Sequence, residues 1–210
     1  MSRLTFIETI KVLDGVYYNL PSHIDRIRQT MQLFFNITTD INSLFLSVPV
    51  KFQKGLVKCR IVYSNKTAII SFEPYIFQNI RSLYLIEDDQ IDYSYKSTDR
   101  GNLKKLLLKK GEMDEVLIIK NGLVTDTSYS NVVFENESGL YTPDSYLLNG
   151  TKRQLLLQKG VIKEIRIRVE DIPLYDKVYL INAMMDIEDS VCVSSDNIFY
   201  NNKKSIIRVG

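Results

Sequence analysis

Two kinds of hydrophobic periodicity follow one another near the N-terminus. Residues 4–12 mix β-branched and other apolar side chains, Asp14-Gly15 then offers a tight turn, and residues 16–18 are again strand-like, so this segment predicts a hairpin. Beyond Pro21 the apolar positions recur every three to four residues, which predicts an amphipathic helix with a proline near its start. Those positions are Ile24, Ile27, Met31 and Phe34.

The segments that follow predict the rest of a first lobe. Residues 56–73 have the pattern of two strands with a turn between them, and residues 82–86 have that of a third strand. We therefore expect a small α+β lobe over residues 1–90. Polar and acidic residues then interrupt the apolar pattern, which predicts a connection between lobes over residues 91–98, with Lys96 inside it.

The second half is richer in β-structure and predicts a larger α+β lobe over residues 99–210. Asp99 is placed to cap a helix that runs to Lys109, and Gly150 opens a second helical stretch with consecutive leucines. The expected strands cover 115–119, a short segment after the Asn121-Gly122 turn, 131–134, the region of Leu140, 164–169, 177–181, and short stretches near Val191 and Ile198.

Composition narrows the class of protein. The chain of 210 residues carries 27 Lys+Arg against 25 Asp+Glu, so we expect no extended basic surface for nucleic acid. Cys59 and Cys192 stand singly in apolar runs and there is 1 histidine, which argues against a zinc site. No apolar run reaches the roughly 18 residues of a membrane span, and we see no signal peptide, so we expect a cytoplasmic protein that does not contact membranes.

Four features are candidates for chemistry, and each also has a plain structural explanation. Lys96 is isolated and could simply be solvated, as could Arg26. Residues 122–131 form a strand that leads into a hydroxyl-rich turn, which could satisfy its own backbone. Residues 148–153 place a glycine at a helix start, where backbone amides attract an anion but where ordinary helices also begin.

Taken in order along the chain, these features resemble the class IV aminotransferase family of pyridoxal-phosphate enzymes. The matching stretches are 23–26, 96–100, 114–131, 149–153 and 181–185. The resemblance spans most of the chain and implies the two-lobed α+β fold of the D-amino acid aminotransferase-like (fold type IV) enzymes, shortened at the N-terminus. Within the family, Lys-x-x-Asp-Arg at Lys96, Asn-Gly-x-x-Arg-Gln at Asn149 and Asn-Ala-x-Met at Asn182 resemble aminodeoxychorismate lyase.

The resemblance implies pyridoxal 5'-phosphate as the cofactor and gives roles to two residues at its reactive ring. Lys96 would bind the cofactor aldehyde as a Schiff base and then shuttle a proton at the substrate. Asp126 falls where the family usually has a glutamate that keeps the pyridine nitrogen protonated. Aspartate is one methylene shorter, so a water could stand between the carboxylate and the ring.

The resemblance also implies a site for the cofactor phosphate. Arg26 matches the family arginine whose planar fork pairs with phosphate oxygens. The start of the second helix matches the other half of that site, at Gly150 and the backbone amides of Thr151 and Lys152. Asn182 and Ala183 align with a loop that faces the phosphate, although Asn182 could equally be an ordinary strand end.

Substrate contacts are less defined by the sequence. Arg60 could reach a substrate carboxylate if it points into a cleft, but strand alternation puts Lys58 on the same face, and both could face solvent. Asp186 could lie near the substrate or be a solvated loop residue. The resemblance implies a small-molecule amino substrate and a homodimer.

The activity expected from the resemblance is the removal of pyruvate from 4-amino-4-deoxychorismate to leave 4-aminobenzoate, a step of folate biosynthesis. One alternative is a pyridoxal-phosphate aminotransferase that acts on a small branched-chain or D-amino acid. A second alternative is a protein that binds the cofactor without turnover, and a third is a plain α+β interaction protein.

Overall fold

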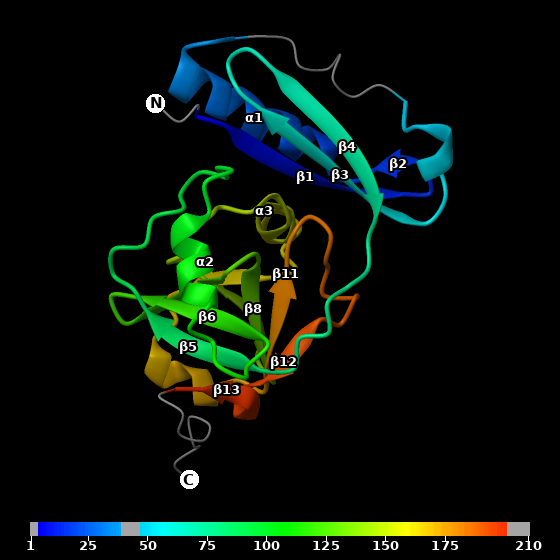
Figure 1. Ribbon diagram of the computed structural model, residues 1–210. Helices are drawn as coiled ribbons and strands as arrows, with labels where there is room; N and C mark the ends of the chain where they lie inside the picture. The colour runs from blue at the N-terminus through cyan, green and yellow to red at the C-terminus, as the bar shows by residue number, and fades with distance from the viewer. Residues whose placement is uncertain (1–3, 39–46, 201–210) are drawn as a thin grey trace. The chain divides into compact units, whose positions relative to one another are not determined.

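The computed structural model describes residues 4–38 and 47–200, and the chain divides into two compact units. Unit 1 comprises Met1–Ile76 with Tyr95–Asp99, and unit 2 comprises Phe77–Ser94 with Arg100–Gly210. Each unit combines helices with antiparallel or mixed sheets, as Figure 1 shows.

This division differs from the ranges 1–90, 91–98 and 99–210 expected from the sequence. Residues 77–90 belong to unit 2, because strand β5 (Leu83–Glu87) pairs in parallel with β6 (Glu115–Lys120). The expected connection is itself divided, since Tyr95–Asp99 folds with unit 1. The expected ranges also include residues 1–3, 39–46 and 201–210, which the structure does not describe.

Unit 1 is built on a four-stranded antiparallel sheet with the order β2-β1-β3-β4. Its strands are β1 (Phe6–Leu13), β2 (Val16–Tyr17), β3 (Leu56–Tyr63) and β4 (Ala68–Pro74). Asp14 and Gly15 have φ of 48° and 79°, the left-handed pair that a two-residue hairpin turn of this twist requires. The hairpin and the two following strands are therefore confirmed.

One face of this sheet carries helix α1 (Leu20–Phe35), which has Pro21 in its first turn as predicted. Alternate residues of β1 and β3 are buried, and with Ile27 and Met31 of the helix they form one apolar core. The amphipathic helix predicted from the three-to-four spacing is thus confirmed. A short 3-10 helix, η2 (Val50–Phe52), precedes β3.

The segment that carries Lys96 is held along the start of β1. The amide of Ile7 donates to the carbonyl of Lys96 at 2.9 Å, and the amide of Thr98 donates to the carbonyl of Thr5 at 3.0 Å. Phe6 and Ser97 form an antiparallel bridge between these two hydrogen bonds. The backbone on both sides of Lys96 is therefore anchored in unit 1.

Unit 2 contains two sheets. The four-stranded sheet has the order β13-β5-β6-β7, with β7 at Leu123–Thr127 and β13 at Ile198–Phe199. The five-stranded sheet has the order β10-β9-β8-β11-β12. Its strands are β8 (Asn131–Asn136), β9 (Gly139–Pro143), β10 (Lys163–Ile165), β11 (Lys177–Ile181) and β12 (Cys192–Ser194).

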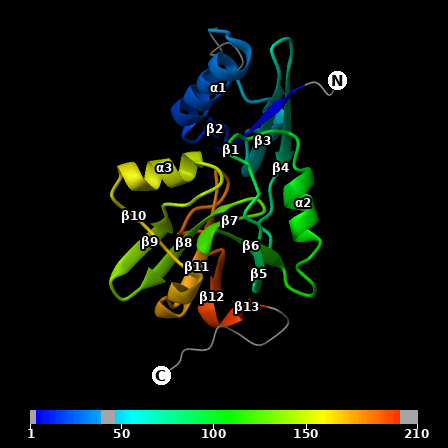
Figure 2. The ribbon, with the colours of Figure 1, turned by 90° about the vertical axis from the view of Figure 1, so that its left-hand side faces the viewer.

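Two helices cover these sheets (Figure 2). Helix α2 (Gly101–Leu107) packs Leu103 and Leu106 on β5 and β6, and helix α3 (Thr151–Gln158) packs Leu156 on β8 and β11. Short 3-10 helices follow at η3 (Val169–Leu174) and η4 (Ser195–Asn197). No helix in residues 4–38 and 47–200 is both long and apolar enough to cross a membrane.

Two local predictions for unit 2 are wrong. The N-cap of α2 is Arg100, one residue later than the expected Asp99, and the helix ends at Leu107 rather than Lys109. The strand expected over 164–169 ends at Ile165, where its parallel pairing with β9 ends, opposite Pro143. The early end of the strand reflects the length of its partner, a tertiary limit that the local sequence pattern does not contain.

Candidate functional site

A buried carboxylate organises the candidate residues of unit 1. Glu8 lies on the face of β1 that α1 covers, and its side chain is fully buried. Its Oε1 accepts from Arg26 Nε at 2.7 Å, and its Oε2 accepts from Arg26 Nη2 at 2.6 Å. His23 Nδ1 lies 2.7 Å from the same Oε2. A fixed guanidinium, an imidazole and a carboxylate thus form one network inside unit 1.

The charges of this network determine its protonation. Burial alone would raise the pKa of Glu8, but the charge of Arg26 and the hydrogen bonds from His23 and Arg26 outweigh it and lower that pKa to about 2. Burial lowers the pKa of His23, and with the charges of Arg26 and Lys96 it outweighs the hydrogen bond and charge of Glu8, which act to raise that pKa. At neutral pH His23 is therefore a neutral donor to an ionised Glu8.

The sequence analysis missed Glu8 as the partner of Arg26. The signal was present, because position 8 belongs to the series Phe6, Glu8, Ile10 and Val12, in which every other member is apolar and buried. A charged residue in such a series must find a partner within the core. His23 and Arg26, both on helix α1, are these partners.

Arg60 lies on the other face of the sheet of unit 1. In the register of the sheet it stands opposite Thr9, whereas Glu8 stands opposite Ile61. Arg60 is exposed, and its neighbour on that face, Lys58, forms an ion pair with Glu73 at 2.6 Å. The structure therefore does not bring Arg60 together with Arg26 and Lys96.

In unit 2 the candidate site centres on Asp126, near the end of β7, a carboxylate with only 5% of its surface exposed. Its Oδ2 accepts from the amides of Leu147 and Leu148 at 3.1 and 2.9 Å, and its Oδ1 accepts from Asn131 Nδ2 at 2.8 Å. Burial raises the pKa of Asp126 to about 6, although these hydrogen bonds act to lower it.

Gly150 and the start of α3 lie against Asn131. Gly150 has φ −68° and ψ 142°, a conformation that any residue adopts, so the backbone angles do not require glycine at this position. A Cβ placed on Gly150 would lie 2.0 Å from Asn131 Oδ1, so the close approach of this side chain requires glycine. Thr151 and Lys152 follow as the first residues of the helix, as predicted.

Lys152 and Asp186 form an ion pair between the start of α3 and the loop after β11. Both side chains are mostly buried, at 12% and 24% exposure. Burial raises the pKa of Asp186, but the hydrogen bond and charge of Lys152 outweigh it and lower that pKa. Asp186 is therefore an ion-pair partner rather than the solvated loop residue that the sequence analysis considered.

Asn182 and Ala183 belong to a tight turn that follows β11. The amide of Asn182 donates to the carbonyl of Met185 and the amide of Met185 donates back, both at 3.1 Å. Asn182 Nδ2 donates to the carbonyl of Tyr129 at 3.5 Å. Because Ile181 of β11 pairs with Asn131 of β8, this turn lies beside the end of β7 and the start of β8.

A second buried carboxylate, not singled out from the sequence, fixes the hydroxyl-rich turn between β7 and β8. Glu115 accepts from the amide of Ser128 at 3.3 Å and from its Oγ at 3.0 Å, and Arg100 donates to the carbonyl of Ser128 at 2.5 Å. Burial raises the pKa of Glu115. Asp126 and Asn131, on either side of this turn, are thereby held in place.

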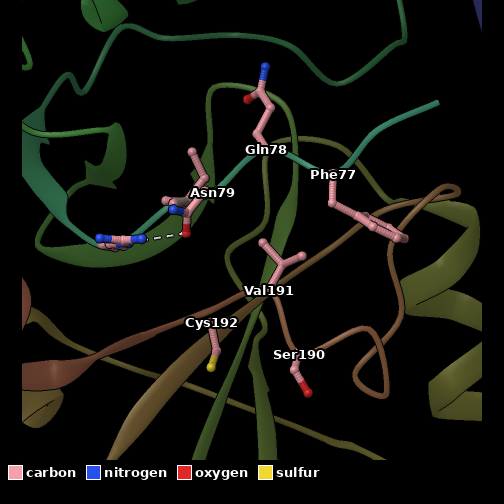
Figure 3. A pocket seen from close by; sticks show the side chains of 8 residues that line it. Phe77, Gln78, Asn79, Ser190, Val191 and Cys192 are labelled. Carbon is pink, nitrogen blue, oxygen red and sulfur yellow. Dashed lines mark hydrogen bonds between the residues drawn. The ribbon is translucent and has the colours of Figure 1, made fainter.

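A pocket of about 300 Å³ also opens in unit 2, away from these residues (Figure 3). It is lined by Phe77, Gln78, Asn79, Ile80, Arg81, Ser190, Val191 and Cys192. None of the site residues predicted from the sequence lines it, so the pocket and the Asp126 cluster are separate features.

Comparisons with known proteins agree with the resemblance seen in the sequence. Residues 5–188 match the family model described as amino-transferase class IV. An uncharacterised protein of Haemophilus influenzae is 37% identical over 180 residues, which cover 84% of this chain and 96% of that protein. A crystal structure from Haemophilus somnus 129pt, provisionally named 4-amino-4-deoxychorismate lyase, is 33% identical with a TM-score of 0.76 and covers 88% of this chain and 98% of that one.

More distant structures share the fold. The pyridoxal-phosphate-bound form of a hypothetical aminotransferase from Mycobacterium tuberculosis has 18% identity and a TM-score of 0.76, and covers 97% of this chain and 83% of that one. The branched-chain amino acid aminotransferase of Escherichia coli has 17% identity and a TM-score of 0.69, and covers 94% of this chain and 77% of that one. With its α+β fold and a family match over most of its length, the chain belongs to the class IV aminotransferases, enzymes that use pyridoxal phosphate.

Proposed function

We propose that this protein is a pyridoxal-phosphate-dependent lyase that removes pyruvate from 4-amino-4-deoxychorismate and releases 4-aminobenzoate. The observation that carries the proposal is the 33% identity, over 98% of its chain, to the Haemophilus somnus structure provisionally named for that activity. The motifs at Lys96, Asn149 and Asn182, which resemble this lyase in particular, support it.

The contacts of Asp126 fit the cofactor ring. An ionised carboxylate offers about four accepting positions, and the hydrogen bonds from Asn131, Leu147 and Leu148 occupy two on Oδ2 and one on Oδ1. Among the described residues, no other contact uses the second accepting position of Oδ1. A protonated pyridine nitrogen could donate to that position. The two loop amides also fix the direction in which the carboxylate points.

Bound pyridoxal phosphate supplies an aldehyde that links to amines and a protonated ring that withdraws electrons from the carbon bearing the substrate nitrogen. Asp126 holds a proton at the ring nitrogen, because a cation beside its carboxylate favours the ionised form. Lys96 supplies the amine that attaches the cofactor, and its Nζ then moves a proton at the substrate.

The remaining residues bind the phosphate. The plane of the Arg26 guanidinium is fixed by two hydrogen bonds to Glu8, which use two of its five N–H donors, and the phosphate would be bound through donors other than these two. The first amides of α3, after Gly150, and the positive end of the helix favour an anion. The resemblance assigns the turn at Asn182 and Ala183 to the same phosphate.

A test of cofactor attachment uses the purified protein incubated with pyridoxal phosphate. We expect a visible absorption band, and reduction with borohydride followed by peptide mapping should place the pyridoxyl group on Lys96. Lys96→Ala should lose the label, whereas Lys66→Ala, which changes a lysine in the β3–β4 turn, should keep it. Label on any other lysine, or on none, contradicts the proposal.

A test of the activity uses synthetic 4-amino-4-deoxychorismate. The proposal predicts equal amounts of 4-aminobenzoate and pyruvate from the wild-type protein and neither product from Lys96→Ala. Bound cofactor without product would instead indicate a protein that binds the cofactor without turnover.

An aminotransferase is the second candidate, and the fold likeness to branched-chain aminotransferase favours it. In that case, addition of a small branched-chain or D-amino acid without an acceptor would convert the bound cofactor to its pyridoxamine form. The lyase keeps the aldehyde form through each turnover, so a spectrum recorded under these conditions separates the two activities.

A further inference from the structure

Asn131 makes contacts that tie the Asp126 carboxylate to the entry of helix α3. We infer that Asn131 is a positioning residue that locks the Asp126 carboxylate against the loop of Leu148 and Gly150. The link to cofactor binding rests on the proposed function, whereas the lock itself is a property of unit 2 alone.

The hydrogen bonds of Asn131 fix the orientation of its side-chain amide. Its Nδ2 donates to Asp126 Oδ1 at 2.8 Å and to the carbonyl of Leu148 at 2.8 Å. A carboxylate and a carbonyl can only accept, so the NH₂ group must face both of them. Asn131 is buried, with 6% exposure, so no solvent molecule easily replaces either contact.

The opposite side of the same amide meets Gly150. Because Nδ2 faces the two acceptors, Oδ1 points to the α3 entry, where a Cβ on Gly150 would lie 2.0 Å from it. The peptide around Gly150 is therefore held against Asn131 by contact on one side and by the Leu148 hydrogen bond on the other. The position of the first amides of α3 is thus coupled to the position of the Asp126 carboxylate.

The backbone of Asn131 makes a third link. In the ladder between β8 and β11 it stands opposite Ile181, the last residue before the Asn182 turn. Asn131 thereby adjoins three parts of the proposed site. These are the Asp126 carboxylate, assigned to the cofactor ring, and the entry of α3 and the Asn182 turn, both assigned to the phosphate. Removing its amide should affect the protonation of Asp126 and the binding of phosphate together.

The first experiment needs no cofactor. The titration of the Asp126 carboxyl group is followed by carbon-13 NMR in the cofactor-free protein, with Asp126→Asn to assign the signal. Asn131→Ala and the uncharged, near-isosteric Asn131→Leu both remove the donor, so the titration midpoint should rise in each. Asn136→Ala changes an asparagine of the same strand that lies outside this cluster and should leave it unchanged. A midpoint that does not move in Asn131→Leu overturns the inference.

The second experiment tests the steric half of the lock. Gly150→Ala should lower the thermal unfolding midpoint strongly in the wild-type protein and much less in the Asn131→Ala background, where the Cβ has room. Strict additivity of the two substitutions would show that Asn131 does not constrain the α3 entry, and would overturn this part of the inference.

The third experiment connects the lock to the cofactor. The dissociation constant of pyridoxal phosphate, measured by fluorescence against pH, should increase about tenfold or more in Asn131→Ala, with a shifted pH profile, and stay constant in Asn136→Ala. Unchanged affinity in folded Asn131→Ala overturns the link to the cofactor. If the wild-type protein binds no pyridoxal phosphate, the proposed function fails while the first two experiments still decide the role of Asn131.

Discussion

Glu8 accepts hydrogen bonds from both Nε and Nη2 of Arg26, and the carboxylate that fixes this guanidinium is fully buried. The charge of Arg26 therefore has a partner in the core, and so does the ring of His23. A side chain that holds two others in this way should be more important for stability than its own contact area suggests.

We predict that Glu8→Ala lowers the free energy of unfolding by about 3–5 kcal/mol, because the buried ends of Arg26 and His23 lose their partner. Urea denaturation measures the change. Glu73→Gln removes the carboxylate of an exposed ion pair on the same sheet and should have little effect. Similar losses for both variants would contradict the central place of Glu8.

The same carboxylate makes stability depend on acid. Its pKa is about 2 in the folded protein against 4.5 for the free side chain, so its contribution is complete above pH 4.5 and is lost as the pH falls toward 2. The loss should amount to about 3 kcal/mol. Unfolding measured at several pH values should show this decline in the wild-type protein and not in Glu8→Gln.

Asp126 should act in the opposite direction in the cofactor-free protein. Burial raises its pKa from 3.8 to about 6, so the folded state favours the protonated form and stability decreases as the pH rises from about 4 to 6. The decrease should be about 3 kcal/mol at most. The free energy of unfolding is measured across this pH range for the wild type and for Asp126→Asn, and their difference gives the contribution of Asp126. A difference that does not change with pH would contradict the raised pKa of this buried carboxyl group.

Arg153 should not tolerate replacement by lysine. Its guanidinium lies 4.1 Å from the centre of the Tyr146 ring, donates to the carbonyl of Pro143 at 3.0 Å and forms an ion pair with Glu164. An ammonium cannot make these contacts together, so Arg153→Lys should cost about 2 kcal/mol in the free energy of unfolding. Arg166→Lys, at an exposed position nearby in the sequence, is the control and should be near neutral.

The ion pair between Lys152 and Asp186 offers a test in unit 2. Asp186→Asn leaves a mostly buried ammonium without its charged partner and should lower stability by about 1–3 kcal/mol, measured by urea denaturation. Asp196→Asn changes an exposed aspartate and serves as the matched control. Equal stability of the two variants would show that the ion pair contributes nothing measurable.

Local signals predicted much of the secondary structure. The Asp14-Gly15 turn marked a hairpin, and the apolar segment over 177–181 became β11 within the same limits. The limits of the lobes could not be found in this way, because they depend on the pairing of β5 with β6, two strands separated by helix α2. Such pairing is not encoded in the periodicity of either segment.

The candidate site shows the same contrast. The positions of Lys96, Asp126 and Gly150 followed from motif order, but the reason for glycine at 150 did not, because the contact with Asn131 joins residues 19 positions apart. Glu8 could have been noticed as a charged residue in an apolar series. That it binds Arg26 could not be predicted, because this contact depends on how α1 packs on the sheet. Side-chain partners across elements require the tertiary structure.

The segment Tyr95–Asp99 folds with unit 1, although the chain on both sides of it belongs to unit 2. Neither unit is therefore an uninterrupted stretch of sequence. A fragment that stops at Ile76 would lack both Lys96 and the backbone that pairs with the first residues of β1. An exchange of lobes at a single point in the sequence would therefore separate Lys96, the proposed attachment site of the cofactor, from the strand that holds its backbone.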